Sequence, residues 1–194
     1  KAYDYCKDKF GAFKYDYINA HAPFYEDTEV ELHWRVHSLP NPFANKRLQK
    51  WFAEHEDDLQ SGTAELKGAG SIVVPSNEFN AFFILLHCYH HMFESGLGLR
   101  QLMDYYFVLC TSYENTSTNS AQAHNENVVE LFEQFGMMRF AKGVMWIMQQ
   151  VFGLDEKLCI CDADECEGAF LLKEIMLNGN FGHHDERNVK VKYK

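Results

Sequence analysis

Polar and apolar residues alternate strictly in the segment 28–38, TEVELHWRVHS. Successive side chains of a β-strand leave opposite faces, so this alternation predicts a half-buried strand with one polar and one apolar face. Its polar members are Glu29, Glu31, His33 and Arg35. Together with the preceding residues, the pattern predicts an antiparallel hairpin over residues 13–36, with Trp34 buried and Glu31 exposed.

The polar face of this strand has two interpretations. A solvated face with charge pairs across strands needs no ligand. A face that carries carboxylates, an imidazole and a guanidinium can equally form a catalytic or metal-binding surface. The alternation alone leaves both interpretations open.

Helical periodicity follows this strand. Residues 41–59 have apolar side chains at helical spacing and predict a surface helix. The small and polar residues 60–70, QSGTAELKGAG, predict a loop, and a short extended segment leads from there to Pro75. Only helical patterns lie beyond Pro75, so we predict an α/β region over residues 1–75 and a helical domain over residues 76–194.

The first two helices of the helical domain are strongly apolar. One is apolar on nearly all sides, which predicts a central buried helix from Ser76 or Asn77 to about Ser95. The next spans residues 99–110. Its predicted inward-facing residues are Leu99, Leu102, Met103, Tyr106, Phe107 and Cys110.

Capping signals predict where the remaining helices begin. A polar loop over residues 111–127 is predicted to end at a capping box formed by Asn127 and Glu130. Two helices, each ended by a glycine, follow this box. A second box, Asp164 with Glu167, is predicted to begin the last helix. The predicted fold class is therefore α+β, mainly α.

Composition narrows the possible functions. The 194 residues are 46% hydrophobic, and the formal net charge of −10 disfavours binding to nucleic acid, which usually requires a basic surface. No run approaches 18 apolar residues, so we expect no membrane span, and no leader suggests secretion. The six cysteines are scattered and predict reduced thiols. The cytoplasm is the expected location.

Further candidate residues lie in the helical domain. His87, His91 and Glu94 have the i, i+4, i+7 spacing of metal ligands on a helix, although histidines hydrogen-bonded at a helix interface would look the same. Arg100 opposes the helix dipole in a first turn. It is therefore expected to have a tertiary partner, either a carboxylate such as Asp104 or an anionic ligand such as phosphate.

Three segments together resemble a known family. VELHWRV at 30–36, LLHCYHHMFESGLGLRQLMDYYFVL at 85–109 and GNFGHHDER at 179–187 are similar to the uncharacterised nucleotidyltransferase family of the DNA polymerase β superfamily. The resemblance implies a partial nucleotidyltransferase palm with a β-hairpin, followed by a helical domain. It also implies transfer of a nucleoside monophosphate from a nucleoside triphosphate to an acceptor that the sequence does not identify.

The same resemblance implies roles for individual residues. The superfamily holds two Mg²⁺ or Mn²⁺ ions with a pair of acids and a third carboxylate. Glu31 falls where the third carboxylate is expected, as a catalytic residue and metal ligand, and Glu29 is a second candidate ligand. His33, Arg35 and Arg100 are the candidates for binding the nucleotide.

The sequence also departs from this family. No glycine-led acid-x-acid motif precedes Glu29, and the chain opens as KAYDYCKDKF without an initiator methionine. We therefore expect that an upstream segment is missing and that the chain is inactive by itself. Two alternatives remain: a non-catalytic binding or scaffold module that retains the fold, and a metal-dependent hydrolase that uses His87, His91 and Glu94.

Overall fold

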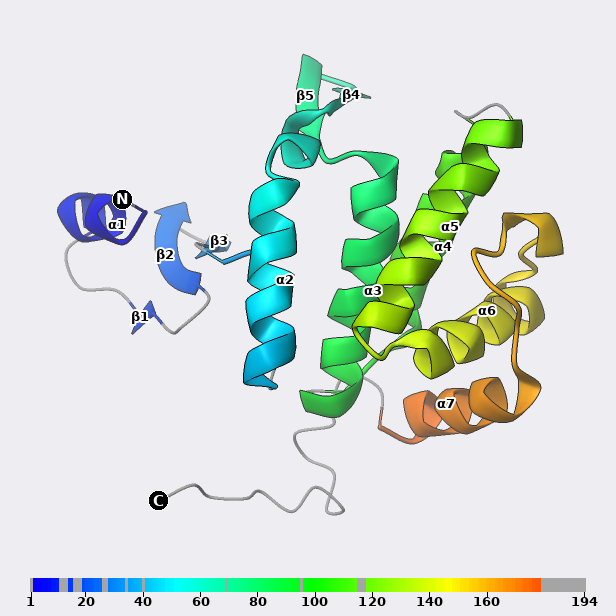
Figure 1. Ribbon diagram of the computed structural model, residues 1–194. Coiled ribbons are helices and arrows are strands. Elements are labelled where there is room, and N and C mark those ends of the chain that lie inside the picture. The colour runs from blue at the N-terminus through cyan, green and yellow to red at the C-terminus, as the bar shows by residue number, and fades with distance from the viewer. Residues whose placement is uncertain are drawn as a thin grey trace. The chain divides into compact units, whose positions relative to one another are not determined.

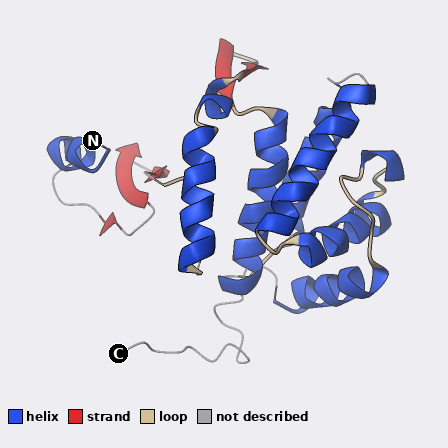
Figure 2. Ribbon diagram, viewed as in Figure 1, coloured by secondary structure: helices blue, strands red, loops and turns tan. Residues whose placement is uncertain are grey.

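The computed structural model divides the chain into two compact units, Lys1–Glu56 and Asp57–Lys194. The predicted domain division at Pro75 stays a prediction. The residues that the structure describes are 2–10, 14–15, 19–25, 28–33, 35–39, 41–68, 70–94, 96–114 and 118–178. Within them helices predominate, and strands form two small sheets (Figure 2), which confirms the predicted α+β, mainly α, class.

The first unit combines a small sheet with helices. Its elements are α1 (Ala2–Phe10), β1 (Lys14–Tyr15), β2 (Asn19–Tyr25), β3 (Thr28–His33) and α2 (Pro42–Glu54). The sheet has the order β1-β2-β3, and both pairs are antiparallel. In the hairpin of β2 and β3, Ala20 is paired with Leu32 and His21 with Glu31. The predicted antiparallel hairpin is therefore present, with a short third strand beside it.

The strand β3 is shorter than its alternating sequence predicts, because it ends at His33. The backbone that follows turns away to bond with α2. The side chain of Gln49 donates to the carbonyl of His37 at 2.7 Å, and the amide of Leu39 donates to Oδ1 of Asn45 at 3.0 Å. Asn41 caps the first turn of α2 with its side chain. These bonds fix the connection between strand and helix.

The second unit contains a hairpin and the main helices (Figure 1). Its elements are η1 (Asp57–Gln60), β4 (Gly62–Leu66), β5 (Gly70–Val74), α3 (Asn77–Glu94), α4 (Leu99–Glu114), α5 (Thr118–Gln134), α6 (Met138–Phe152), η2 (Glu156–Leu158) and α7 (Glu165–Asn178). No helix in the described part of the chain is long and apolar enough to cross a membrane.

The loop predicted at residues 60–70 is wrong, because β4 and β5 pair there as an antiparallel hairpin. Its end is tight: Leu66 is the partner of Gly70. Both Gly68 and Gly70 have positive φ, 87° and 82°, a conformation that residues with a Cβ rarely adopt. The glycines that suggested a loop therefore make the turn of a hairpin.

The helices α3 to α6 enclose the core of the second unit. α3 packs against α4 and α5, and α6 packs against α4, α5 and α7 (Figure 1). Side chains that are fully buried include Phe82, Leu85, Leu86, Leu102, Tyr105, Phe132, Met145, Ile147 and Met148. The predicted central helix is confirmed in α3, which begins one residue after Ser76; the hydroxyl of Ser76 accepts a hydrogen bond from the amide of Phe79 at 3.1 Å.

The inward face of α4 is rotated from the predicted one. Met103 is 42% exposed and Phe107 is 58% exposed, although both were predicted to face inward. The buried residues are Leu102, Tyr105 and Leu109, which have i, i+3, i+7 spacing. The prediction is therefore confirmed for Leu102 and wrong for Met103 and Phe107; Leu99, Tyr106 and Cys110 are half-buried.

The polar loop predicted at residues 111–127 is also wrong. Helix α4 continues to Glu114 and α5 already begins at Thr118. Asn127, the predicted cap, lies inside α5 and donates to Oε1 of Glu78 in α3 at 3.1 Å. Alanine, glutamine and glutamate in this polar stretch favour a helix even without an apolar face.

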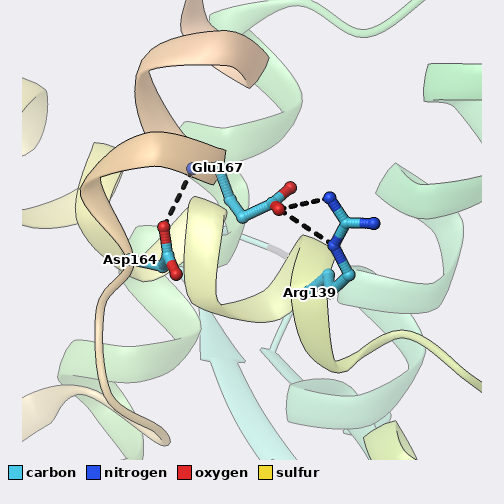
Figure 3. Close-up of polar contacts among 3 residues, drawn as sticks. All are labelled: Arg139, Asp164 and Glu167. Atoms are coloured by element: carbon cyan, nitrogen blue, oxygen red, sulfur yellow. Dashed lines mark hydrogen bonds and ion pairs between the residues drawn. The ribbon is translucent and has the colours of Figure 1, made fainter.

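A helix cap begins α7, and an ion pair joins α7 to α6 (Figure 3). Oδ1 of Asp164 accepts from the amide of Glu167 at 2.9 Å, as the capping box predicts. The amide of Asp164 donates to the carbonyl of Lys142 at 3.1 Å, so Glu167 does not complete the box. Its carboxylate instead accepts from Nε of Arg139 at 2.9 Å and also contacts Nη2. Because Arg139 is largely exposed, this pair adds little stability.

Candidate functional site

The two candidate metal ligands occupy alternate positions of β3. Glu31 is paired with His21 of β2, and Glu29 lies two residues earlier in the same strand. The side chains of both glutamates, and all of Trp34, lie outside what the structure describes. The exposure of Glu31 and the burial of Trp34 therefore stay predictions.

Of the two neighbouring candidates for binding the nucleotide, His33 lies in the strand and Arg35 lies after it. His33 is the last residue of β3 and is exposed. Arg35 was predicted to belong to the strand, but it lies half-buried in the bend that leads to α2. Because Asn45 and Gln49 hold residues 37 and 39 of this connection, the backbone near Arg35 is fixed by α2.

Arg100 lies at the start of α4, after a tight turn from α3. The amide of Gly96 donates to the carbonyl of His91 at 2.7 Å, and the φ of 91° at Gly96 ends α3 in a left-handed conformation. The side chain of Gln101 then accepts from the amide of Gly98 at 3.0 Å and caps α4. Leu97 between the two glycines is buried, which anchors the turn in the core.

Among the described residues, Arg100 has no hydrogen-bond or ion-pair partner. Arg100 and Asp104 are both exposed, and no hydrogen bond or ion pair joins Arg100 to another described residue. Of the two alternatives expected for Arg100, the salt bridge with Asp104 does not form, and the anionic ligand stays a prediction. Asp104 acts electrostatically on Cys88 of α3, whose pKa rises to about 12 through burial first and this carboxylate second.

The two candidate histidines of α3 contact each other directly. Nε2 of His87 and Nε2 of His91 lie 3.0 Å apart, and the two rings are nearly perpendicular, at 86°. The sequence predicted either metal ligands or histidines hydrogen-bonded at a helix interface; a contact between the two rings on the same helix was not predicted. The side chain of Glu94, the third member of the hydrolase hypothesis, lies outside the described residues, as does the whole of the segment 179–187. That hypothesis stays a prediction.

The other described residues form no larger metal-ligand group. Across the described residues, no group of three or more histidine, cysteine or acidic side chains could hold a metal ion. The CICDADEC segment places Cys159 and Cys161 half-buried and Cys166 exposed, all as free thiols. The structure thus groups the candidates locally: Glu29, Glu31 and His33 on one strand, and His87 with His91 on one helix.

The burial of Tyr105 in the core was not predicted from the sequence. This side chain is fully buried, and its hydroxyl has no hydrogen-bond partner among the described residues. Burial raises the pKa of Tyr105 well above its usual value, and the nearby thiols Cys161, Cys88 and Cys159 raise it further. An apolar stripe of Leu102, Tyr105 and Leu109 was the available signal, but the competing stripe through Tyr106 obscured it.

Comparison with known proteins gives one assignment. No curated protein and no solved structure matches the chain significantly. Residues 5–153 match the family described as uncharacterised nucleotidyltransferase, a range that includes β3, α3 and α4 and ends directly after α6. This range covers well over half of the 194 residues. The chain therefore belongs to the uncharacterised nucleotidyltransferase family.

Proposed function

We propose that this protein transfers a nucleoside monophosphate from a nucleoside triphosphate to an acceptor. The family match over residues 5–153 is the observation that carries the proposal, since it includes both the polar strand β3 and the start of α4. In this proposal residues 1–75 are a palm-like region that binds the metal and the triphosphate. Residues 76–194 are a helical domain that contributes Arg100.

Glu31 and Glu29 are the proposed ligands for a divalent cation, Mg²⁺ or Mn²⁺. They stand at alternate positions of one strand, and carboxylate oxygen is the donor that both ions prefer. These residues therefore fit such an ion in their chemistry. A bound ion would neutralise charge on the phosphate oxygens during transfer.

The phosphates themselves call for cationic partners. Arg35 lies two residues after the end of β3, in a connection that is bonded to α2, so we propose that its guanidinium binds phosphate oxygens. Arg100 is exposed and bonded to no other described residue, which leaves its five donors available for an anion. His33, exposed at the end of β3, is the proposed hydrogen-bond donor to the nucleotide.

The test substitutes Glu31 by Gln in the complete protein. Nucleotide transfer from labelled triphosphates should fall at least about 100-fold, because a lost metal ligand removes transition-state charge stabilisation. Folding should be nearly unchanged, since surface substitutions usually alter stability by about 0.5 kcal/mol or less. Glu65→Gln is the matched control, because Glu65 is an exposed carboxylate on the strand β4.

The outcomes separate the candidate functions. Loss of transfer by Glu31→Gln, with Glu65→Gln unaffected, supports the proposal. Tight nucleotide binding without any transfer by the wild type would instead support the non-catalytic module. Equal transfer by wild type and Glu31→Gln would remove Glu31 from the site.

A further inference from the structure

The paired histidines of α3 offer a site that nucleotide transfer does not use. His87 and His91 project from successive turns, and their Nε2 atoms are 3.0 Å apart. Both side chains are half-buried, so the pair lies at the edge of the core and is reachable from solvent. We infer that His87 and His91 form a two-histidine site for a divalent transition-metal ion such as Cu²⁺, Ni²⁺ or Zn²⁺.

The distance between the nitrogens carries the inference. Two imidazole nitrogens that each bind one tetrahedral ion at about 2.0–2.1 Å lie about 3.3 Å from each other. The observed separation of 3.0 Å needs only a small side-chain adjustment to reach this value. Positions i and i+4 of a helix place both rings on one face, so the backbone already sets the spacing.

A metal ion can replace the proton between the two Nε2 atoms if that proton moves to the other nitrogen of its ring. When both rings are neutral, a hydrogen bond between the two Nε2 atoms places the proton of one ring on Nε2 and that of the other on Nδ1. Metal binding requires both Nε2 atoms to be bare, with both protons on Nδ1. One proton therefore moves from Nε2 to Nδ1 through solvent, and both rings stay neutral.

The surroundings define the ligand set. Phe83 stacks beside His87, with ring centroids 6.1 Å apart, and provides an apolar wall. Cys88, the next residue, is not available as a ligand: it is fully buried and its thiol contacts the carbonyl of Gln101 at 3.9 Å. The described residues supply two nitrogen ligands, and water completes the coordination.

Two imidazole ligands predict a preference for transition-metal ions, whereas the proposed carboxylate ligands of the nucleotide site favour Mg²⁺ or Mn²⁺. Imidazole nitrogens favour Cu²⁺ over Ni²⁺ and Zn²⁺, and these over Mn²⁺, whereas Mg²⁺ prefers oxygen. Titration of the untagged protein with each ion should give this order, with no Mg²⁺ binding at His87 and His91. The imidazole ¹⁵N signals of both residues report metal at Nε2 directly.

Two substitutions test the assignment. His87→Asn and His91→Asn should each weaken Zn²⁺ binding. The loss of affinity should exceed the roughly 10–100-fold that is typical when a residue that only hydrogen-bonds a metal ligand is substituted. His90→Asn on the same helix is the matched control and should bind Zn²⁺ normally. A paired His183→Asn, His184→Asn variant tests the other histidine pair of the sequence.

The outcomes are unambiguous. Thermal unfolding of the apo variants checks that each one folds; if His87→Asn does not, the ¹⁵N titration of the wild type still decides. Unchanged Nε2 signals at saturating Zn²⁺ would overturn the inference. So would Zn²⁺ affinity that survives in His87→Asn and His91→Asn but is lost in the His183, His184 variant.

Discussion

A Cβ atom placed at Gly168 would lie 2.5 Å from Cε3 of Trp146, so α7 touches α6 where residue 168 has no side chain. The indole presents three ring or stem atoms to this position within 2.7 Å. Nearby, a Cβ atom at Gly143 of α6 would lie 3.1 Å from the carbonyl carbon of Glu167. Glycine on each helix therefore sets how closely the two helices approach.

Gly168→Ala should destabilise the protein. Alanine favours a helix over glycine by about 0.5–1 kcal/mol, but an added methyl against the rigid indole costs about 1–3 kcal/mol. The expected net loss is about 1 kcal/mol, measured from urea unfolding. Ala169→Ser, at an exposed neighbour, is the control. A Gly168→Ala variant more stable than the wild type would contradict the close approach.

Asp164→Ala should also lower stability, through the cap of α7. The lost hydrogen bond to the amide of Glu167 should cost about 1 kcal/mol. Asp162→Ala removes an exposed carboxylate two residues earlier and controls for charge. Arg139→Ala, which breaks only the exposed ion pair, should have a smaller effect than Asp164→Ala. The reverse order would mean that the ion pair, and not the cap, holds α7.

Thiol chemistry should distinguish the cysteines. Burial and Asp104 raise the pKa of Cys88 to about 12, so at pH 8 this thiol is protonated as well as inaccessible. Cys166 is exposed. Cys166→Ala should therefore remove about one equivalent of fast labelling by a disulfide reagent, and Cys88→Ala should remove none. Fast labelling of Cys88 in the native protein would contradict its burial.

The same shift predicts how stability depends on pH. An unfolded thiol ionises near pH 9, whereas Cys88 and Cys161 in the folded protein have pKa values of about 12. Between these values the folded state holds more protons than the unfolded state, so stability falls as pH rises from 9 to 12. Cys88→Ala should flatten this fall in urea titrations. An unchanged slope would show that Cys88 does not contribute.

Tyr105→Phe should leave the protein equally stable or more stable. The Tyr105 hydroxyl has no partner among the described residues, and a buried hydroxyl without a hydrogen bond costs about 1–3 kcal/mol. Tyr106→Phe is the contrasting control, because the interaction of the Tyr106 hydroxyl with Cys110 raises the pKa of Tyr106. A clear loss of stability in Tyr105→Phe would indicate a hydroxyl partner such as an ordered water.

Arg100→Ala should separate binding from folding. Arg100 is exposed and bonded to no other described residue, so thermal stability should hardly change. Triphosphate affinity should fall by about 10- to 150-fold if Arg100 contributes a charge-assisted hydrogen bond of about 1.5–3 kcal/mol. Lys173→Ala, on the exposed face of α7 and outside the family match, is the control. Unchanged affinity would remove Arg100 from the nucleotide site.

Element types were predictable where one pattern dominated. The helix α3 is apolar on nearly all sides, and α7 begins at a clear cap, so both were predicted close to their observed starts. The β2–β3 hairpin followed from strict alternation. The end of β3 was not predictable from alternation, which continues beyond His33, whereas the connection that follows the strand is bonded to Asn45 and Gln49.

Predictions failed where two local signals competed. Glycines at 68 and 70 suggested a loop but make the turn of a hairpin, and the polar start of α5 lacked an apolar stripe. On α4, adjacent tyrosines offered two stripes, and packing against α3 and α6 selected the one with Tyr105. For the site, spacing placed His87 and His91 on one face of a helix, where they contact each other. Spacing also offered Asp104 as a partner for Arg100, and this pair does not form.

The packing of α7 on α6 extends the folded unit beyond the end of the family match. The region matched by the family ends at residue 153, but Leu171 and Ile175 of α7 are buried and Gly168 lies against Trp146. A fragment cut at residue 153 would uncover this side of α6 and present an apolar patch, which promotes self-association. In this chain the region that matches the family is therefore shorter than the region that must be expressed for α7 to cover the apolar side of α6.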